Sequence, residues 1–101
     1  MAEIIWSPEA LADLDAIREF IARDAPRSAT RFIQRIFDRV EQLKHFPTSG
    51  RMVPELGRAN FREISVKRYR IIYRIREEQL VEIVTVYHGA RLLDWQSLVE
   101  E

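Results

Sequence analysis

Arginine is the residue type in this sequence that most clearly indicates a function, because its side chain binds anions. Residues 58–76 hold seven basic side chains and one acidic side chain, and His88 and Arg91 follow soon after. Guanidinium groups bind phosphates and carboxylates, but they do not exchange protons near neutral pH. His88 is the one group near them that titrates in that range. The pattern therefore predicts binding of an anionic partner, with a single proton-handling group beside it.

The formal net charge of zero conceals a strong asymmetry along the chain. Residues 1–25 carry a charge of −4, residues 26–57 carry +3, residues 58–76 carry +6 and residues 77–101 carry −5. Exposed charges farther apart than a Debye length of about 8 Å are largely screened from one another. The basic stretch therefore generates a local positive field, and we expect one face of the protein to meet an acidic partner.

Length and composition exclude several classes of protein. A chain of 101 residues with 47% hydrophobic residues predicts one folded domain, residues 1–101. The absence of cysteine excludes a disulfide scaffold and thiolate metal sites, and it fits the reducing cytoplasm. No apolar run approaches the roughly 20 residues that span a bilayer, so we expect no contact with a membrane. His45 and His88 have no metal-ligand spacing, and we expect neither a metal nor a cofactor.

The N-terminal half is predicted to be a strand followed by two helices. Residues 2–6 are apolar and favour a strand, and Ser7-Pro8 provides an N-cap and a first helical position. Apolar residues then recur at helical spacing to about Arg23 and, after the break at residues 24–26, to about Phe46. The short connection predicts an antiparallel helical hairpin whose apolar stripes face each other and a sheet.

The C-terminal half is predicted to be mainly strands. Residues 47–60 hold two of the three glycines and two of the four prolines, which predicts a loop. The three segments 61–65, 69–76 and 80–87 predict a three-stranded antiparallel meander, and residues 91–101 are compatible with a short terminal helix. This order of elements defines an α+β fold.

The alternation within residues 69–76 determines which side chains share a face. It places the two tyrosines of this strand against the helical hairpin, and Arg70 and Arg74 on the other face. Arg62 belongs to the adjacent strand, and His88 and Arg91 follow the last strand. We therefore expect these basic side chains to converge.

Four short segments carry a resemblance to a known family. They are Trp6-Ser7-Pro8-Glu9-Ala10 with Asp13-Leu14, Phe46-Pro47-Thr48-Ser49-Gly50-Arg51, Tyr69-Arg70-Ile71-Ile72-Tyr73, and Val86-Tyr87-His88-Gly89-Ala90-Arg91. In this order and at these intervals they resemble the RelE/ParE superfamily of toxins from bacterial type II toxin–antitoxin modules. The resemblance covers nearly all of the chain, and it implies the fold described above.

The resemblance implies one of two activities. RelE-like toxins are ribosome-dependent messenger RNA endonucleases, whereas ParE-like toxins poison DNA gyrase. A RelE-like reading would assign catalysis to Arg62, Arg70, His88 and Arg91. Strand cleavage needs a general base and a general acid, yet Phe61-Arg62-Glu63-Ile64 stands where RelE-like nucleases have paired lysines, and no terminal tyrosine is present. We therefore predict no catalytic residues and a ParE-like binding toxin, with the RelE-like endoribonuclease as the alternative.

The ParE-like reading implies specific partners. We expect DNA gyrase as the target, with the ribosome as the alternative, and a cognate antitoxin that forms a heteromeric complex with the chain. Operator DNA would be contacted only through the antitoxin, and the complex would act in the cytoplasm.

Two sets of residues are predicted to contact these partners. A basic surface for the target or the antitoxin is expected at Arg62, Lys67, Arg68, Arg70, Arg74 and Arg91. An apolar groove covered by the antitoxin is expected at Leu11, Leu14, Ile33 and Phe37.

Overall fold

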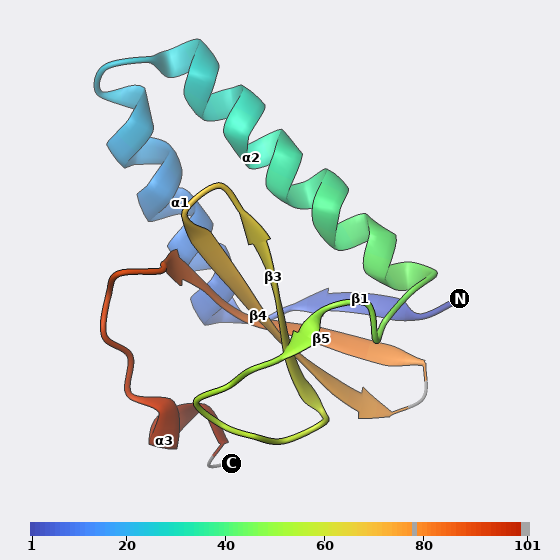
Figure 1. Ribbon diagram of the computed structural model, residues 1–101. Coiled ribbons are helices and arrows are strands. Elements are labelled where there is room, and N and C mark those ends of the chain that lie inside the picture. The colour runs from blue at the N-terminus through green and yellow to red at the C-terminus, as the bar shows by residue number, and fades with distance from the viewer. Residues whose placement is uncertain (78, 100–101) are drawn as a thin grey trace.

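The protein is built on a five-stranded sheet with a pair of antiparallel helices on one face (Figure 1). The computed structural model describes residues 1–77 and 79–99. The elements are β1 (Glu3–Trp6), α1 (Pro8–Ala22), α2 (Pro26–Glu41), a 3-10 turn (Gln42–Lys44), β2 (Arg51–Met52), β3 (Phe61–Val66), β4 (Tyr69–Glu77), β5 (Leu80–His88) and α3 (Trp95–Val99). The strand order is β1-β5-β4-β3-β2, with β1 parallel to β5 and the other pairs antiparallel. The predicted α+β class is confirmed.

The structure corrects several predicted boundaries. The predicted loop over residues 47–60 contains β2, which pairs with β3 through Arg51 and Met52. A two-residue strand is too short to produce a visible alternation in the sequence. The second helix ends at Glu41 and continues only as a 3-10 turn, short of the predicted Phe46. Of the predicted terminal helix, only Trp95–Val99 is helical, and residues 100–101 lie outside the described residues.

Polar side chains fix α1 to the sheet. The Ser7 hydroxyl accepts a hydrogen bond from the first turn of α1, as predicted, and donates to the carbonyl of Val84 at 2.8 Å. One carboxylate oxygen of Asp13 accepts from the Thr85 hydroxyl at 2.7 Å and from the Val86 N–H at 2.9 Å. These bonds satisfy polar groups of β5 next to the position where its pairing with β4 shifts register.

The sheet separates two hydrophobic clusters. On the helix side, Ile71 and Tyr73 of β4 pack in the main core with α1 and α2. On the opposite side, Ile72 and Tyr87 pack with the segment after β2 and with α3, which lie beside each other in Figure 1. This confirms the predicted alternation in β4. None of the helices in the described residues is long and apolar enough to cross a membrane.

Candidate functional site

Arg70, the central residue of the predicted basic surface, is held by two carboxylates. Both terminal nitrogens of its guanidinium donate to the carboxylate of Glu55 at 2.9 Å, and its Nε donates to Glu63 at 2.6 Å. The Glu63 side chain is 2% exposed, and it also pairs with Arg51. The anion that Arg70 binds is thus supplied by the chain itself.

Aromatic rings complete the surroundings of Arg70. Its guanidinium carbon lies 5.4 Å from the ring centre of Tyr87 and 5.3 Å from that of Trp95, within the range of a cation–π contact. Hydrogen bonding to Glu55 raises the pKa of Arg70, and the same contact lowers the pKa of the Glu55 carboxyl. Burial raises the pKa of the Tyr87 hydroxyl. Arg70 therefore ties β3, β5, the segment after β2 and α3 together.

Arg62 lies on the opposite face of the sheet from Arg70. It pairs in register with Tyr73, so its side chain is on the helix side. Its guanidinium donates to the carbonyls of Ala59 at 3.1 Å, Thr48 at 3.3 Å and Gly50 at 3.0 Å. The expected convergence of Arg62 with Arg70 is wrong, because strand register assigns them to different faces.

His88 is also separated from Arg70 by the sheet. It pairs in register with Tyr69, whose ring lies 5.5 Å from the His88 ring on the helix side. The His88 Nδ1 accepts a hydrogen bond from the Ala90 N–H at 3.2 Å, which stabilises the turn after β5. His88 and Arg91 do come together, since both line a pocket of about 190 Å³ beside α1.

The six residues of the predicted basic surface therefore lie at separate places on the protein. Arg74 shares the face of Arg70, and its guanidinium carbon lies 5.4 Å from the ring centre of Phe61. Lys67 and Arg68 form the exposed turn between β3 and β4. Arg91 is exposed beyond β5. The structure thus places the basic residues at several sites instead of one continuous surface.

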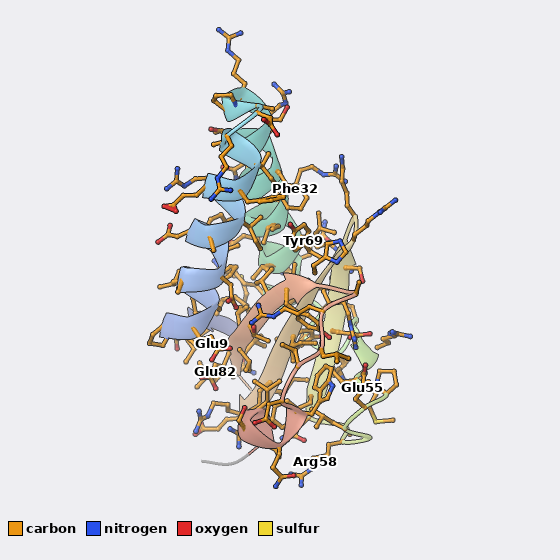
Figure 2. The ribbon with its side chains drawn as sticks, turned by 90° about the vertical axis from the view of Figure 1, so that its left-hand side faces the viewer. Glu9, Phe32, Glu55, Arg58, Tyr69 and Glu82 are labelled. Carbon is orange, nitrogen blue, oxygen red and sulfur yellow. The ribbon has the colours of Figure 1, made fainter. Side chains whose placement is uncertain are left out.

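An apolar pocket lies where the tip of the helical hairpin meets the turn between β3 and β4. Its volume is about 400 Å³, and we call it the hairpin-tip pocket; it is lined by Phe20, Ile21, Ser28, Phe32, Lys67, Arg68, Tyr69 and His88. Figure 2 shows Phe32 and Tyr69 side by side, with ring centres 5.4 Å apart. Phe20 remains 64% exposed. The pocket combines an apolar wall with a rim of two cations, which suits an apolar side chain next to a negative charge.

The four residues of the predicted antitoxin groove differ in exposure. Leu11 is 47% exposed on α1, whereas Leu14 is 5% exposed and belongs to the main core. Ile33 and Phe37 of α2 are partly buried, and Phe37 packs on Trp6 with ring centres 5.0 Å apart. Leu14 therefore lies beneath any surface groove, while the other three reach its margin.

A buried tyrosine hydroxyl was not anticipated from the sequence. Tyr73 donates to the carbonyl of Pro47 at 2.7 Å and accepts from the Gly50 N–H at 3.0 Å. A Cβ on Gly50 would lie 2.6 Å from the carbonyl oxygen of Glu63, so only glycine fits there. A glycine in the sequence indicates such a close approach, but no sequence pattern identifies the group that approaches it. Among the described residues, no cluster of three acidic or histidine side chains could hold a metal ion.

Solved structures share this fold. The chain matches a structure described as the chromosomal ParDE TA system from P. aeruginosa with a TM-score of 0.73 and 22% identity, covering 87% of this chain and 96% of that one. It also matches the YoeB/ParE toxin from Agrobacterium tumefaciens with a TM-score of 0.59 and 19% identity, covering 87% and 98%. The fold is therefore that of these toxins.

Sequence comparison identifies the family. Residues 4–93 match the family described as ParE toxin of type II toxin-antitoxin system, parDE. The chain is 37% identical over 92 residues to Toxin RelE2 of Caulobacter vibrioides, covering 91% of this chain and all of that protein. The chain belongs to the ParE toxin family, which implies an antitoxin partner.

Proposed function

We propose that this toxin inhibits DNA gyrase by binding it, without catalysis of its own, and that a cognate antitoxin neutralises it. The engagement of Arg70 is the observation that carries this proposal. Its guanidinium is occupied by Glu55 and Glu63, and the sheet separates it from Arg62 and His88. A phosphate at Arg70 would have to displace two carboxylates, and the group beside it that could handle a proton is the Tyr87 hydroxyl, whose pKa is raised by burial. This arrangement favours a binding protein.

The hairpin-tip pocket is the proposed contact for gyrase. It offers the exposed ring of Phe20 beside the cations Lys67 and Arg68. Exposed aromatic rings next to arginine are typical of binding hot spots. Arg91, exposed beyond β5, extends the basic rim.

Two matched variants test this contact. Phe20→Asp should abolish inhibition of supercoiling by purified gyrase and leave folding stability within about 0.5 kcal/mol, because the side chain is exposed. Phe46→Asp is the control, since Phe46 is 65% exposed but does not line the pocket. Equal inhibition by both variants would exclude the hairpin-tip pocket.

The antitoxin is proposed to cover the helical hairpin. Leu11, Ile33 and Phe37 would border the contact, with Leu14 supporting it from the core. A disordered segment that orders on binding needs such apolar anchors. Leu11→Asp should weaken antitoxin binding measured by calorimetry, whereas Phe46→Asp should not.

A second candidate function is a RelE-like endoribonuclease acting on the ribosome. One observation favours it: His88 and Arg91 line a shared pocket with Tyr69 and Asp13. A histidine, a tyrosine and a cation are groups that such a reaction uses. Message cleavage that disappears in His88→Ala would support this candidate over gyrase binding.

A further inference from the structure

A row of arginines on α2 is not used by the proposed function. Arg27, Arg31, Arg35 and Arg39 recur every fourth residue of the helix. Successive members lie about 6 Å apart along the helix axis. Like charges at this spacing destabilise a helix by a few tenths of a kcal/mol per pair, and a bound anion would offset this repulsion.

Three of these arginines line a groove together with Lys67. The groove runs between α2 and the turn joining β3 and β4, which reaches the side of α2 in Figure 1. Two pockets of about 260 and 400 Å³ form it, and Arg31, Arg35, Arg39 and Lys67 are their basic lining residues. We call this the arginine groove. Of the described residues that line it, Asp38 is the one carboxylate.

The arginine groove keeps a net positive charge, because four cations and one carboxylate line it among the described residues. Arg31 donates to the Ser28 hydroxyl at 3.3 Å, and Arg39 donates to the side-chain carbonyl of Gln42 at 3.1 Å, so both acceptors are uncharged. Across residues 1–77 and 79–99, none of the four cations is in an ion pair. The groove contrasts with Arg70, whose charge is met by two carboxylates.

Lys67 occupies a backbone conformation that favours glycine. Its φ of 53° lies in the left-handed region, where a side chain is disfavoured and glycine is not. A glycine would form this turn more easily. The two-residue turn between β3 and β4 requires a positive φ at this position, and the side chain that stands there lines the groove.

We propose that the arginine groove binds the sugar–phosphate backbone of duplex DNA, independently of base sequence. The choice of DNA rests on the proposed function, because duplex DNA is the substrate of gyrase. This direct contact differs from the sequence-based expectation that operator DNA is reached only through the antitoxin. Arg31 and Arg39 are about 12 Å apart along the helix axis, a length that includes about three to four phosphates on each strand of a duplex. The groove thus matches a short stretch of backbone.

The adjoining hairpin-tip pocket, which shares Ser28, Phe32 and Lys67 with the groove, holds the exposed ring of Phe20. The lining of the groove itself offers little apolar surface. Its apolar residues, Val66 and Phe32, are only 5% and 8% exposed. A disordered acidic peptide needs apolar anchors to offset its loss of entropy on ordering. Single strands need exposed aromatic rings on which bases stack. A rigid duplex backbone needs only the cations.

Fluorescence anisotropy with a short labelled duplex and the full-length toxin, without gyrase, tests this proposal. Binding should weaken by roughly 10²-fold between about 50 and 200 mM salt if four phosphates are contacted. Arg35→Gln should lower the affinity and reduce the slope of log K against log salt by about one. Arg58→Gln is the matched control, because Arg58 is exposed at the opposite end of the molecule from Phe32 (Figure 2).

Lys67→Gly is a variant in which misfolding would not explain a loss of DNA binding. It should weaken DNA binding as Arg35→Gln does, while the melting temperature stays the same or rises because the turn is relieved of strain. Absence of DNA binding by the wild-type chain, or equal binding by all variants, would overturn the proposal. So would tighter binding to duplex RNA or to an acidic peptide with the same residue dependence. Because gyrase is absent from the assay, these outcomes are independent of whether gyrase is the target.

Discussion

At the scale of single residues, the environment of Arg70 supports the proposal of a binding function. An arginine in a Tyr-Arg motif next to other basic residues is suited to phosphate chemistry. Here Glu63, 3% exposed as a residue, and Glu55 supply the counter-charge from β3 and from the segment after β2. In this chain Arg70 therefore stabilises the fold through these ion pairs.

Glu63→Gln should destabilise the protein by about 3 kcal/mol, because it leaves the guanidinium of Arg70 without one buried partner. Urea denaturation measures this loss. Glu82→Gln removes a carboxylate that pairs with Arg76 at 2.9 Å, where both side chains are more exposed, 17% and 39%. That control should cost less than about 1 kcal/mol. Similar losses in the two variants would contradict a structural role for Glu63.

Tyr73→Phe should cost about 1–3 kcal/mol at neutral pH, because the Gly50 N–H loses its buried acceptor. Burial raises the pKa of Tyr73 above its ordinary value of 10.0. The stability that the protonated hydroxyl contributes is therefore complete below pH 10 and is lost as pH rises through the folded-state pKa. Unfolding free energies of the wild-type protein should fall more steeply above pH 10 than those of Tyr73→Phe. Parallel curves would show that Tyr73 does not titrate in this way.

At the scale of elements, long periodic segments could be predicted and short or bridging ones could not. The helices α1 and α2 and the strand β4 each carry several periods of their pattern, so their sequences predict them. The strand β2 has two residues and exists because it pairs with β3. The face of Arg62 depended on the register of β3 against β4, which no local pattern specifies. The carboxylate of Glu55 reaches Arg70 across 15 residues of chain, a contact set by tertiary structure alone.

The link between α1 and β5 can be tested at this scale. Asp13→Ala should lower stability by about 2 kcal/mol, because it removes the acceptor for the Thr85 hydroxyl and the Val86 N–H. Asp13→Asn should recover part of this loss, since its amide oxygen still accepts. Thermal unfolding with hydrogen exchange at Val86 measures both effects. Full stability of the alanine variant would contradict the link.

At the scale of the whole molecule, net neutrality coexists with separate charged regions. Arg68 and Lys67 project at the exposed turn of the sheet, while Arg70 is internally paired, so charge reversal tests a partner surface at the turn and not at Arg70. Arg68→Glu should weaken association with gyrase by about tenfold at low ionic strength, and less at high ionic strength, because it acts on electrostatic steering. Arg58→Glu is the control. A loss that does not depend on salt would contradict steering.

The central claim is that this ParE-family toxin acts by binding gyrase and not by cutting RNA. The direct measurement adds the purified toxin in parallel to gyrase with relaxed plasmid and to translating ribosomes, and records plasmid topology and message length. We predict that supercoiling is blocked or the plasmid is cleaved, that the message stays intact, and that cognate antitoxin restores supercoiling. Cleaved message that becomes intact in His88→Ala, with supercoiling unaffected, would contradict the claim.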